Sequence, residues 1–284
     1  MNAAKETSRA LADALLPVRD RFAHKGDFGK VLLLCGSVGY TGAAAMAARA
    51  ALRTGSGLIF LGVPEAVYPI LAAKLDEPIV FPLPDDGFGR LSEEALPEIL
   101  WRLRGCDACL AGPGLGQSDG VRAIIAGLLG GKVPLVLDAD GINVLSGHID
   151  LLRGAACPVV VTPHEGEFRR LGGELDALSR QEAAERLASD AGCVVLLKGH
   201  ETVVTDGKET YVNRTGNPGM ATGGSGDVLA GILVSLLGQG APLLEGAAAA
   251  AWIHGSAGDL CAAEIGEYGL TPGDMIRAIP RLLK

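Results

Sequence analysis

Short, continuously apolar runs recur along most of the chain. They are typical of strands buried on both faces, because a strand with one exposed face alternates apolar and polar residues instead. Segments with helical spacing of apolar residues separate these runs, which predicts repeated β-α-β units around a parallel sheet. The expected strands are residues 31–35, 58–63, 78–83, 108–111, 134–137, 158–161 and 194–197. The expected helices among them are residues 43–53, 93–102, 120–129 and 180–191.

The pattern changes near residue 200. Two strand-like segments, 201–205 and 209–212, flank Asp206-Gly207, a dipeptide that favours the tight turn of a β-hairpin. After Gly219 only helical patterns follow, at 227–237, 243–264 and 272–283, and residues 1–30 predict a leading helix and a loop that caps the sheet. The predicted fold class is therefore α/β, with a doubly wound, mostly parallel sheet flanked by helices, in a single domain over residues 1–284.

Composition supports this class. Hydrophobic residues make up 48% of the 284 residues and aromatic residues only 4%, so Ala, Val, Leu and Ile must fill the core. The mean hydropathy of +0.30 raises the question of a membrane. However, the longest apolar stretches, 228–238 and 246–253, are shorter than the roughly 18 residues that span a bilayer. No apolar signal region begins the chain, so we expect a cytoplasmic protein without a membrane partner.

Charge narrows the range of partners. The formal net charge is −8 and no basic stripe occurs, so nucleic acid is not an expected partner. An acidic protein can still bind an anionic nucleotide through helix N-termini, glycine-rich backbone amides, a lysine and a metal ion. Of the six cysteines, Cys106 and Cys109 form one C-x-x-C pair. No second pair completes a zinc site, so buried thiols are the favoured interpretation.

The segment from Asn217 to Asp227 reads NPGMATGGSGD and precedes a long apolar helix. Bare glycine backbone lets amides converge on an anion, and the helix dipole favours negative charge at that end. Asp227 stands where an acid would lie beside a transferring phosphoryl group, and the natural role is to take the proton from an attacking hydroxyl. The alternative is that Asp227 caps the helix after a glycine turn. The long glycine run favours the catalytic role.

Five further loops follow expected strands, and most of them have both a functional and a structural interpretation. Gly112-Pro-Gly-Leu-Gly116 lacks dinucleotide spacing. It could open a ligand site at the carboxyl edge of the sheet, where ligands bind in α/β proteins, or be a plain strand-to-helix turn. In Thr162-Pro-His164-Glu-Gly-Glu167, His164 and Glu167 could enter the same crevice, with Glu167 holding a magnesium-bound water, or Glu167 could serve only the first turn of a helix. Asp138-Ala-Asp140 could reach a metal or a ribose, or could cap the next helix.

The remaining loops are less specific. Lys198-Gly-His-Glu-Thr202 could place Lys198 and Thr202 on a phosphate, or leave a solvated lysine at a turn. Gly36-Ser-Val-Gly-Tyr40-Thr-Gly-Ala43 could bind a nucleotide or the other substrate. No Walker motif occurs. Together these loops predict a crevice for an anionic nucleotide and a second ligand.

Taken together, these motifs resemble the NAD(P)H-hydrate dehydratase family of the ribokinase-like superfamily. The resemblance covers nearly the whole chain. It rests on HKGDFG at 24–29, YTGA at 40–43, GPGLG at 112–116, DAD at 138–140, TPH at 162–164, KG at 198–199 and GMATGGSGD at 219–227.

The resemblance implies repair of a damaged cofactor, namely NADH or NADPH that has gained water at C6 of the nicotinamide ring. In the family, the S epimer of the hydrate is phosphorylated on its hydroxyl and phosphate is then eliminated. Bacterial members use ADP with Mg²⁺ and release AMP and phosphate, whereas eukaryotic members use ATP. Relatives form tetramers, and many bacterial ones carry an N-terminal epimerase domain. We expect this chain to contain no epimerase domain, to form a homotetramer and to depend on a separate epimerase.

The resemblance also assigns roles to positions. It implies that Ala43, Gly116, His164 and Asp227 contact the hydrated cofactor. It implies that the adenine nucleotide is bound by Lys198, Gly199, His200, Glu201, Thr202 and Gly226. Asp227 becomes the base, and Gly224, Ser225 and Gly226 form an anion hole. Two positions depart from the family pattern: Ser225 stands where Thr is usual, and Glu165 where Pro is commoner.

Two other functions remain open from the residues alone. A kinase of a small vitamin precursor, such as a hydroxyethylthiazole or pyridoxal kinase, would use the same fold and base but leave a stable phosphate ester. A nucleotide sensor without catalysis would use the same scaffold, although it has no need of Asp227.

Overall fold

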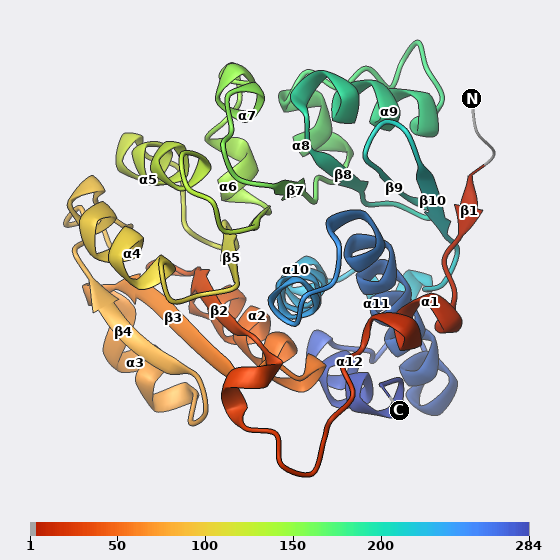
Figure 1. Cartoon of the computed structure of the whole chain (residues 1–284), viewed down its shortest axis with the longest axis horizontal. Coiled ribbons are helices and arrows are strands. Elements are labelled where there is room, and N and C mark those ends of the chain that lie inside the picture. Colours follow the sequence, from red (N-terminus) through yellow and green to blue (C-terminus); the bar gives the residue numbers. More distant parts are fainter. Residues whose placement is uncertain (1–3, 284) are drawn as a thin grey trace.

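Ten strands form one sheet in the order β1-β10-β9-β8-β7-β6-β5-β2-β3-β4 (Figure 1). This computed structural model describes residues 4–283. The strands are β1 (Lys5–Glu6), β2 (Lys30–Leu34), β3 (Leu58–Pro64), β4 (Ile79–Leu83), β5 (Ala108–Ala111), β6 (Leu135–Leu137), β7 (Val159–Val161), β8 (Val194–Leu197), β9 (Thr202–Thr205) and β10 (Thr210–Asn213). Strands β2 to β8 pair in parallel, β9 runs antiparallel to both of its neighbours, and β1 pairs in parallel with β10.

Helices cover both faces of this sheet. The longer ones are α1 (Arg9–Leu15), α2 (Thr41–Thr54), α3 (Tyr68–Lys74), α4 (Leu96–Leu103), α5 (Asp119–Leu129), α9 (Arg180–Ala191), α10 (Ser225–Gly238), α11 (Leu243–Ile265) and α12 (Pro272–Ala278). Short helices are α6 (Asp140–Asn143), α7 (Asp150–Arg153) and α8 (Glu165–Arg170). None of the helices in the described part of the chain is long and apolar enough to cross a bilayer.

The alternation of side chains along β2 shows why its sequence is continuously apolar. Val31 and Leu33 belong to a core cluster with α2, α10 and α11, whereas Leu32 and Leu34 belong to a second cluster with α4, α5 and α9 on the opposite face. Figure 1 shows these two helical layers on either side of the sheet. A strand that is buried on both faces has no solvent side on which polar residues would be favourable.

The predicted strands and the hairpin are confirmed, with boundaries within one residue. Asp206 Oδ1 accepts hydrogen bonds from the amides of Lys208 and Glu209, which closes the turn between β9 and β10. The three C-terminal helices are confirmed, but α10 begins at Ser225 rather than Asp227, and α12 ends at Ala278 before a 3-10 turn that contains Pro280. Proline lacks an amide hydrogen, which explains the early end of α12.

Two features differ from the prediction, and a third confirms it. The two-residue strand β1 was missed because Lys5 and Glu6 are exposed and charged. The leading helix α1 is present, but it packs on α11 rather than on the sheet, and residues 1–3 lie outside the described part. The prediction of buried thiols is confirmed, because all six cysteines are buried.

Candidate active site

The winding of the sheet reverses between β2 and β5, which lie side by side with Leu34 opposite Ala111. At such a switch point the loops that leave the strands diverge, and a crevice opens at the carboxyl ends. The two loops are tied together here. The amide of Gly36 donates to the carbonyl of Pro113 (2.8 Å), and the Ser37 hydroxyl donates to the carbonyl of Gly114 (2.7 Å). A Cβ on Gly114 would be 3.1 Å from that of Ala43, so these predicted loops meet.

Gly112 follows β5 at a position where a side chain cannot fit. Its φ is +141°, and a Cβ would lie only 1.7 Å from the carbonyl oxygen of Asp138. This close approach brings the end of β5 against the end of β6, where Asp138 begins the next loop. The adjacent Ala139 has a φ of +47°, a conformation unfavourable for a residue with a side chain. The backbone is therefore constrained at the point where Asp138 enters the crevice.

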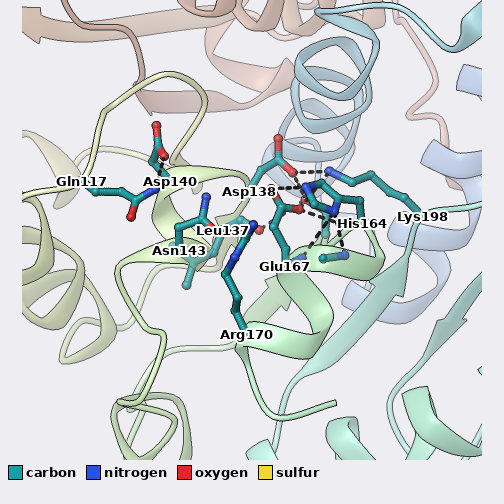
Figure 2. Close-up of polar contacts among 11 residues, drawn as sticks. Gln117, Leu137, Asp138, Asp140, Asn143, His164, Glu167, Arg170 and Lys198 are labelled. Carbon is teal, nitrogen blue, oxygen red and sulfur yellow. Dashed lines mark hydrogen bonds and ion pairs between the residues drawn. The ribbon is translucent and has the colours of Figure 1, made fainter. Parts of the chain in front are cut away.

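Asp138 and Lys198 form the centre of a buried charge cluster (Figure 2). The ammonium Nζ of Lys198 lies 2.8 Å from Oδ1 of Asp138 and 3.7 Å from Oε2 of Glu167. The hydroxyl of Thr162 donates to the same Oδ1 at 2.8 Å. Burial by itself would lower the pKa of Lys198, but the charges of Asp138 and Glu167 outweigh that effect and raise it. Lys198 is therefore a cation.

His164 and Glu167 share the first turn of α8 in a reciprocal cap. Nδ1 of His164 accepts from the amides of Gly166 and Glu167, while Oε2 of Glu167 accepts from the amide of His164 (2.8 Å). Oε1 of Glu167 lies 3.3 Å from Nε2 of His164. The structural interpretation of Glu167, a carboxylate in the first helical turn, is thus confirmed. The same carboxylate also faces Lys198, so it belongs to the charge cluster.

Asp140 has a different role from Asp138. Its Oδ2 accepts from the amide of Gly116 at 2.8 Å and its Oδ1 from the side chain of Gln117 at 3.4 Å. Figure 2 shows Asp140 and Gln117 apart from the group around Lys198. Asp140 therefore holds the glycine loop after β5, and of the two carboxylates only Asp138 reaches the charge cluster.

The glycine-rich loop delivers the N-terminus of α10 to this cluster. Gly224 caps the helix with a φ of +97°, and a Cβ there would be 2.4 Å from the end of Met46 on α2. Amides in the first turn of a helix have no carbonyl partner within it, so those of Gly226 and Asp227 are free to bind an anion. A Cβ on Gly226 would be 3.6 Å from Nζ of Lys198. The helix end and the lysine therefore approach the same space.

Asp227 lies half-buried in that first turn. Burial, reinforced by the charge of Asp138 and opposed by Lys198, raises the pKa of Asp227 to about 7. A carboxylate with a pKa near neutrality is a stronger proton acceptor than an ordinary aspartate and is still ionised in part at pH 7. The environment thus suits a general base.

A cavity of about 660 Å³ lies beside the cluster, within the range of small-molecule sites. Its walls include the predicted residues His164, Lys198, Gly199, His200, Thr202 and Ser225. Sequence reasoning missed part of the wall, namely Asn213, Thr215, Gly216, Leu229, Ala251, His254 and Gly255. Asn217, Pro218, Met220 and Ala221 also line it, and they belong to the glycine-rich motif without having been assigned a contact.

Some predicted residues lie outside this wall. Ala43 and Gly116 lie at the loops of the switch point, and Glu201 is paired with Arg214 (3.1 Å). Arg214 directly follows β10, and no sequence pattern indicated that it would pair with Glu201. Gly226, Asp227 and Glu167 also lie outside the wall, beside Lys198 and Asp138.

Within residues 4–283, no group of three or more His, Cys, Asp or Glu side chains is arranged to hold a metal ion. A magnesium ion at this site would therefore take much of its coordination from phosphate and water, as is usual for that ion. The buried Asp138 suits such a role, because Oδ2 lies 3.9 Å from the Cβ position of Gly226 and accepts no hydrogen bond from the described residues.

Comparison with known protein families shows which family the chain belongs to. The family model described as NAD(P)H-hydrate dehydratase matches residues 31–281. The chain belongs to this family. A bifunctional NAD(P)H-hydrate repair enzyme from Moorella thermoacetica is 43% identical over 275 residues, which cover 95% of this chain and 52% of that protein. An ADP-dependent (S)-NAD(P)H-hydrate dehydratase from Cenarchaeum symbiosum is 37% identical over 95% of this chain and 93% of its own length.

Solved structures agree with this assignment to the dehydratase family. A ribokinase-like superfamily protein from Enterococcus faecalis has a TM-score of 0.85 at 28% identity, covering 98% of this chain and 94% of that one. An ADP/ATP-dependent NAD(P)H-hydrate dehydratase from Bacillus subtilis, co-crystallized with ATP and Mg²⁺, has a TM-score of 0.80 at 28% identity and covers 98% and 97%. The predicted ribokinase-like fold is confirmed. The chain spans about half the length of the first curated relatives that it matches, which are bifunctional.

Proposed function

We propose that this protein restores hydrated NADH and NADPH by ADP-dependent dehydration of the S epimer, releasing AMP and phosphate. One observation carries the proposal: Asp227, with a pKa of about 7, stands in the first turn of α10 beside Lys198 and Asp138. This arrangement combines a proton acceptor with helix amides and a cation for phosphate. Membership of the dehydratase family and the ADP-dependent relative support the choice of substrates.

The chemistry proceeds in two stages. Asp227 takes the proton from the C6 hydroxyl of the hydrate as its oxygen attacks the β-phosphorus of ADP, and AMP leaves. The lone pair of the ring nitrogen then expels phosphate by breaking the C6–O bond. Loss of a proton from C5 of the resulting iminium to water restores the C5–C6 double bond. The first-turn amides of Gly226 and Asp227, with Gly224 and Ser225, form the anion hole in which negative charge on the phosphoryl group is stabilised.

The nucleotide is expected in the 660 Å³ cavity. Its proposed contacts are Lys198, Gly199, His200, Glu201, Thr202 and Gly226, of which four line the cavity directly. Glu201 would have to leave Arg214 to contribute its side chain, so its backbone is the better candidate. The hydrated cofactor is expected at the switch point, near Ala43, Gly116 and Asp227. His164 lines the cavity and is the proposed contact to the hydrated cofactor.

Magnesium is the proposed cofactor, and the neighbour crystallised with ATP and Mg²⁺ supports it. Asp138 would hold the ion through Oδ2, and Glu167 would do so through a water molecule. The ion would supply positive charge to the phosphates. Glu167 already accepts a hydrogen bond from the amide of His164 and contacts Lys198, which suits an indirect role.

The decisive experiment measures recovery of the reduced ring. Hydrated NADH is incubated with the protein, Mg²⁺ and either ADP or ATP, and the absorbance of NADH is followed. Recovery with ADP, with equimolar AMP and phosphate, is the expected result. Recovery with ATP alone would overturn the choice of donor. No recovery, together with phosphorylation of a vitamin precursor, would favour the kinase, and ADP binding without turnover of any kind would favour a sensor.

The proposal also covers the location and assembly of the enzyme and the source of its substrate. We propose a cytoplasmic homotetramer that receives its epimer from a separate epimerase. The match covers about half of the bifunctional NAD(P)H-hydrate repair enzymes, which supports the proposal that a second repair activity accompanies this one. Light scattering on the purified protein tests the tetramer, and a mass corresponding to one chain would contradict it.

A further inference from the structure

His254 on α11 reaches the first turn of α10. Its ring nitrogen Nε2 lies 2.9 Å from the backbone carbonyl oxygen of Ser225 and 3.2 Å from the hydroxyl oxygen of the same residue. Both His254 and Ser225 line the 660 Å³ cavity. The ring therefore contacts the glycine-rich loop at the residue that begins the helix.

The contact with the carbonyl fixes the position of a proton. A carbonyl oxygen only accepts hydrogen bonds, so Nε2 must carry a hydrogen to approach it at 2.9 Å. An unprotonated Nε2 would place its lone pair against that of the oxygen. Because Nε2 is a donor, the Ser225 hydroxyl cannot donate to it. The hydroxyl keeps its own hydrogen for another acceptor.

The ring is also neutral. Burial lowers the pKa of His254 to about 4, so the imidazole carries no charge at neutral pH. A neutral ring with hydrogen on Nε2 cannot act as an acid for the reaction. Its effect is to hold the carbonyl of Ser225 and to determine the direction in which the hydroxyl of Ser225 can donate.

An anion is the natural acceptor for that hydroxyl. Ser225 precedes Gly226, whose Cβ position is 3.6 Å from Nζ of Lys198. A phosphoryl group between the helix end and Lys198 would meet first-turn amides, the ammonium group and the Ser225 hydroxyl together. Among residues 4–283, the side chain of His254 is the hydrogen-bond partner of this hydroxyl, and its Nε2 is already a donor.

We propose that His254 is a positioning residue that makes the Ser225 hydroxyl a hydrogen-bond donor to the phosphoryl group during its transfer. This role rests on the proposed dehydratase function. Negative charge on that group changes most in the transition state, so the donor accelerates transfer more than it strengthens ADP binding.

Four variants test the role. His254→Leu removes the ring donor, whereas His254→Gln retains an N–H at the end of a side chain of similar reach. Ser225→Ala removes the hydroxyl and Ser225→Thr keeps it. Loss of a hydrogen bond to a charged group corresponds to about a tenfold to hundredfold change in rate. We expect His254→Leu and Ser225→Ala to lower kcat by that factor, with the Kd for ADP within about threefold of the parent.

The conservative variants and the double variant make the test specific. His254→Gln and Ser225→Thr should retain most of kcat, and His254→Leu should cost much less in a Ser225→Ala background, because both changes remove one interaction. Full activity of His254→Leu would overturn the proposal. So would equal losses of kcat and ADP affinity in both His254→Leu and His254→Gln, because that is the pattern of a purely structural residue.

A spectroscopic measurement does not depend on activity. ¹⁵N NMR of histidine-labelled protein at pH 7 should show His254 neutral, with its hydrogen on Nε2. A hydrogen on Nδ1, or a charged ring, would overturn the proposal even if every variant folded poorly. If the unaltered protein shows no turnover, the dehydratase function is wrong, and so is the role of His254 in phosphoryl transfer. The NMR result for the hydrogen bond of His254 would not change that conclusion.

Discussion

Lys198 and Asp138 form an ion pair of 2.8 Å between residues that directly follow two parallel strands, β8 and β6. Thr162, which follows the intervening strand β7, donates to the same carboxylate oxygen. Three adjacent strand ends thus supply a cation, a hydroxyl and an anion in one row. The row lies beside Asp227, where the charge of Asp138 helps burial to raise the pKa and Lys198 opposes it.

The first prediction concerns this coupling. Asp138→Asn removes a negative charge beside Asp227, so the pKa of Asp227 should fall below about 7. Since the proposed base, Asp227, must be deprotonated, the acidic limb of the kcat profile should move to lower pH. The profile measured from about pH 5 to 9 tests this. Thr162→Val is the matched control, because it removes a hydrogen bond to Asp138 but leaves the charge; an equal shift in both variants would refute the electrostatic explanation.

The second prediction concerns the proposed base, Asp227. Asp227→Asn keeps the size of the side chain but cannot accept the proton, and general-base catalysis typically contributes roughly 10²–10⁴-fold. We expect kcat to fall by at least about a hundredfold. ADP binding, measured by calorimetry, should persist or tighten because a negative charge near the phosphates is gone. Near-normal turnover would eliminate Asp227 as the base.

The third prediction concerns stability. An aspartate ordinarily has a pKa of 3.8, whereas the pKa of Asp227 is about 7, so the folded state holds this proton more tightly than the unfolded chain does. Folding stability attributable to this group is therefore full below about pH 4 and is lost as pH rises through about 7. Asp227→Asn should raise the Tm at about pH 8 and lose that advantage at about pH 4. A Tm difference independent of pH would contradict the shifted pKa.

The fourth prediction separates two roles of His164. If it contacts the hydrate, His164→Ala should raise KM for hydrated NADH several-fold, with little change in ADP affinity. The variant also removes the helix cap made by Nδ1 to Gly166 and Glu167. His164→Asn is the control, since asparagine also caps helices. A KM restored by Asn would assign the effect to the cap, and a large loss of ADP binding would place His164 on the nucleotide.

The fifth prediction concerns the unusual Glu165. Its carboxylate pairs with Arg180, whose guanidinium donates to the carbonyl of Lys198 at 2.9 Å. This links the loop after β7 to the loop after β8. Arg180→Ala should therefore raise the KM for ADP several-fold by releasing the loop at Lys198. Glu165→Gln, which leaves Arg180 and its bond to the carbonyl in place, should change it much less. Equal effects would mean that the ion pair, and not the carbonyl contact, orders the loop.

Sequence alone determined the elements that a local pattern encodes. The apolar runs 31–35 and 108–111 predicted β2 and β5 within one residue, because burial on both faces excludes polar residues. Asp206-Gly207 predicted the hairpin, and the glycine-rich motif before Asp227 predicted a helix end suited to an anion. Strand β1 escaped prediction, because Lys5 and Glu6 contribute backbone hydrogen bonds without a hydrophobic signal.

Only the tertiary structure decided which side chains meet. Nothing in the sequence distinguishes the role of Asp138 from that of Asp140. In the fold, Asp138 faces Lys198, whereas Asp140 accepts from the amide of Gly116. His254 lies in an apolar helix pattern, and its contact with Ser225 depends on the packing of α11 against α10. The raised pKa of Asp227 arises from burial and from the charge of Asp138, which lies far away along the chain. Such properties depend on distances across the folded chain, which residue spacing does not encode.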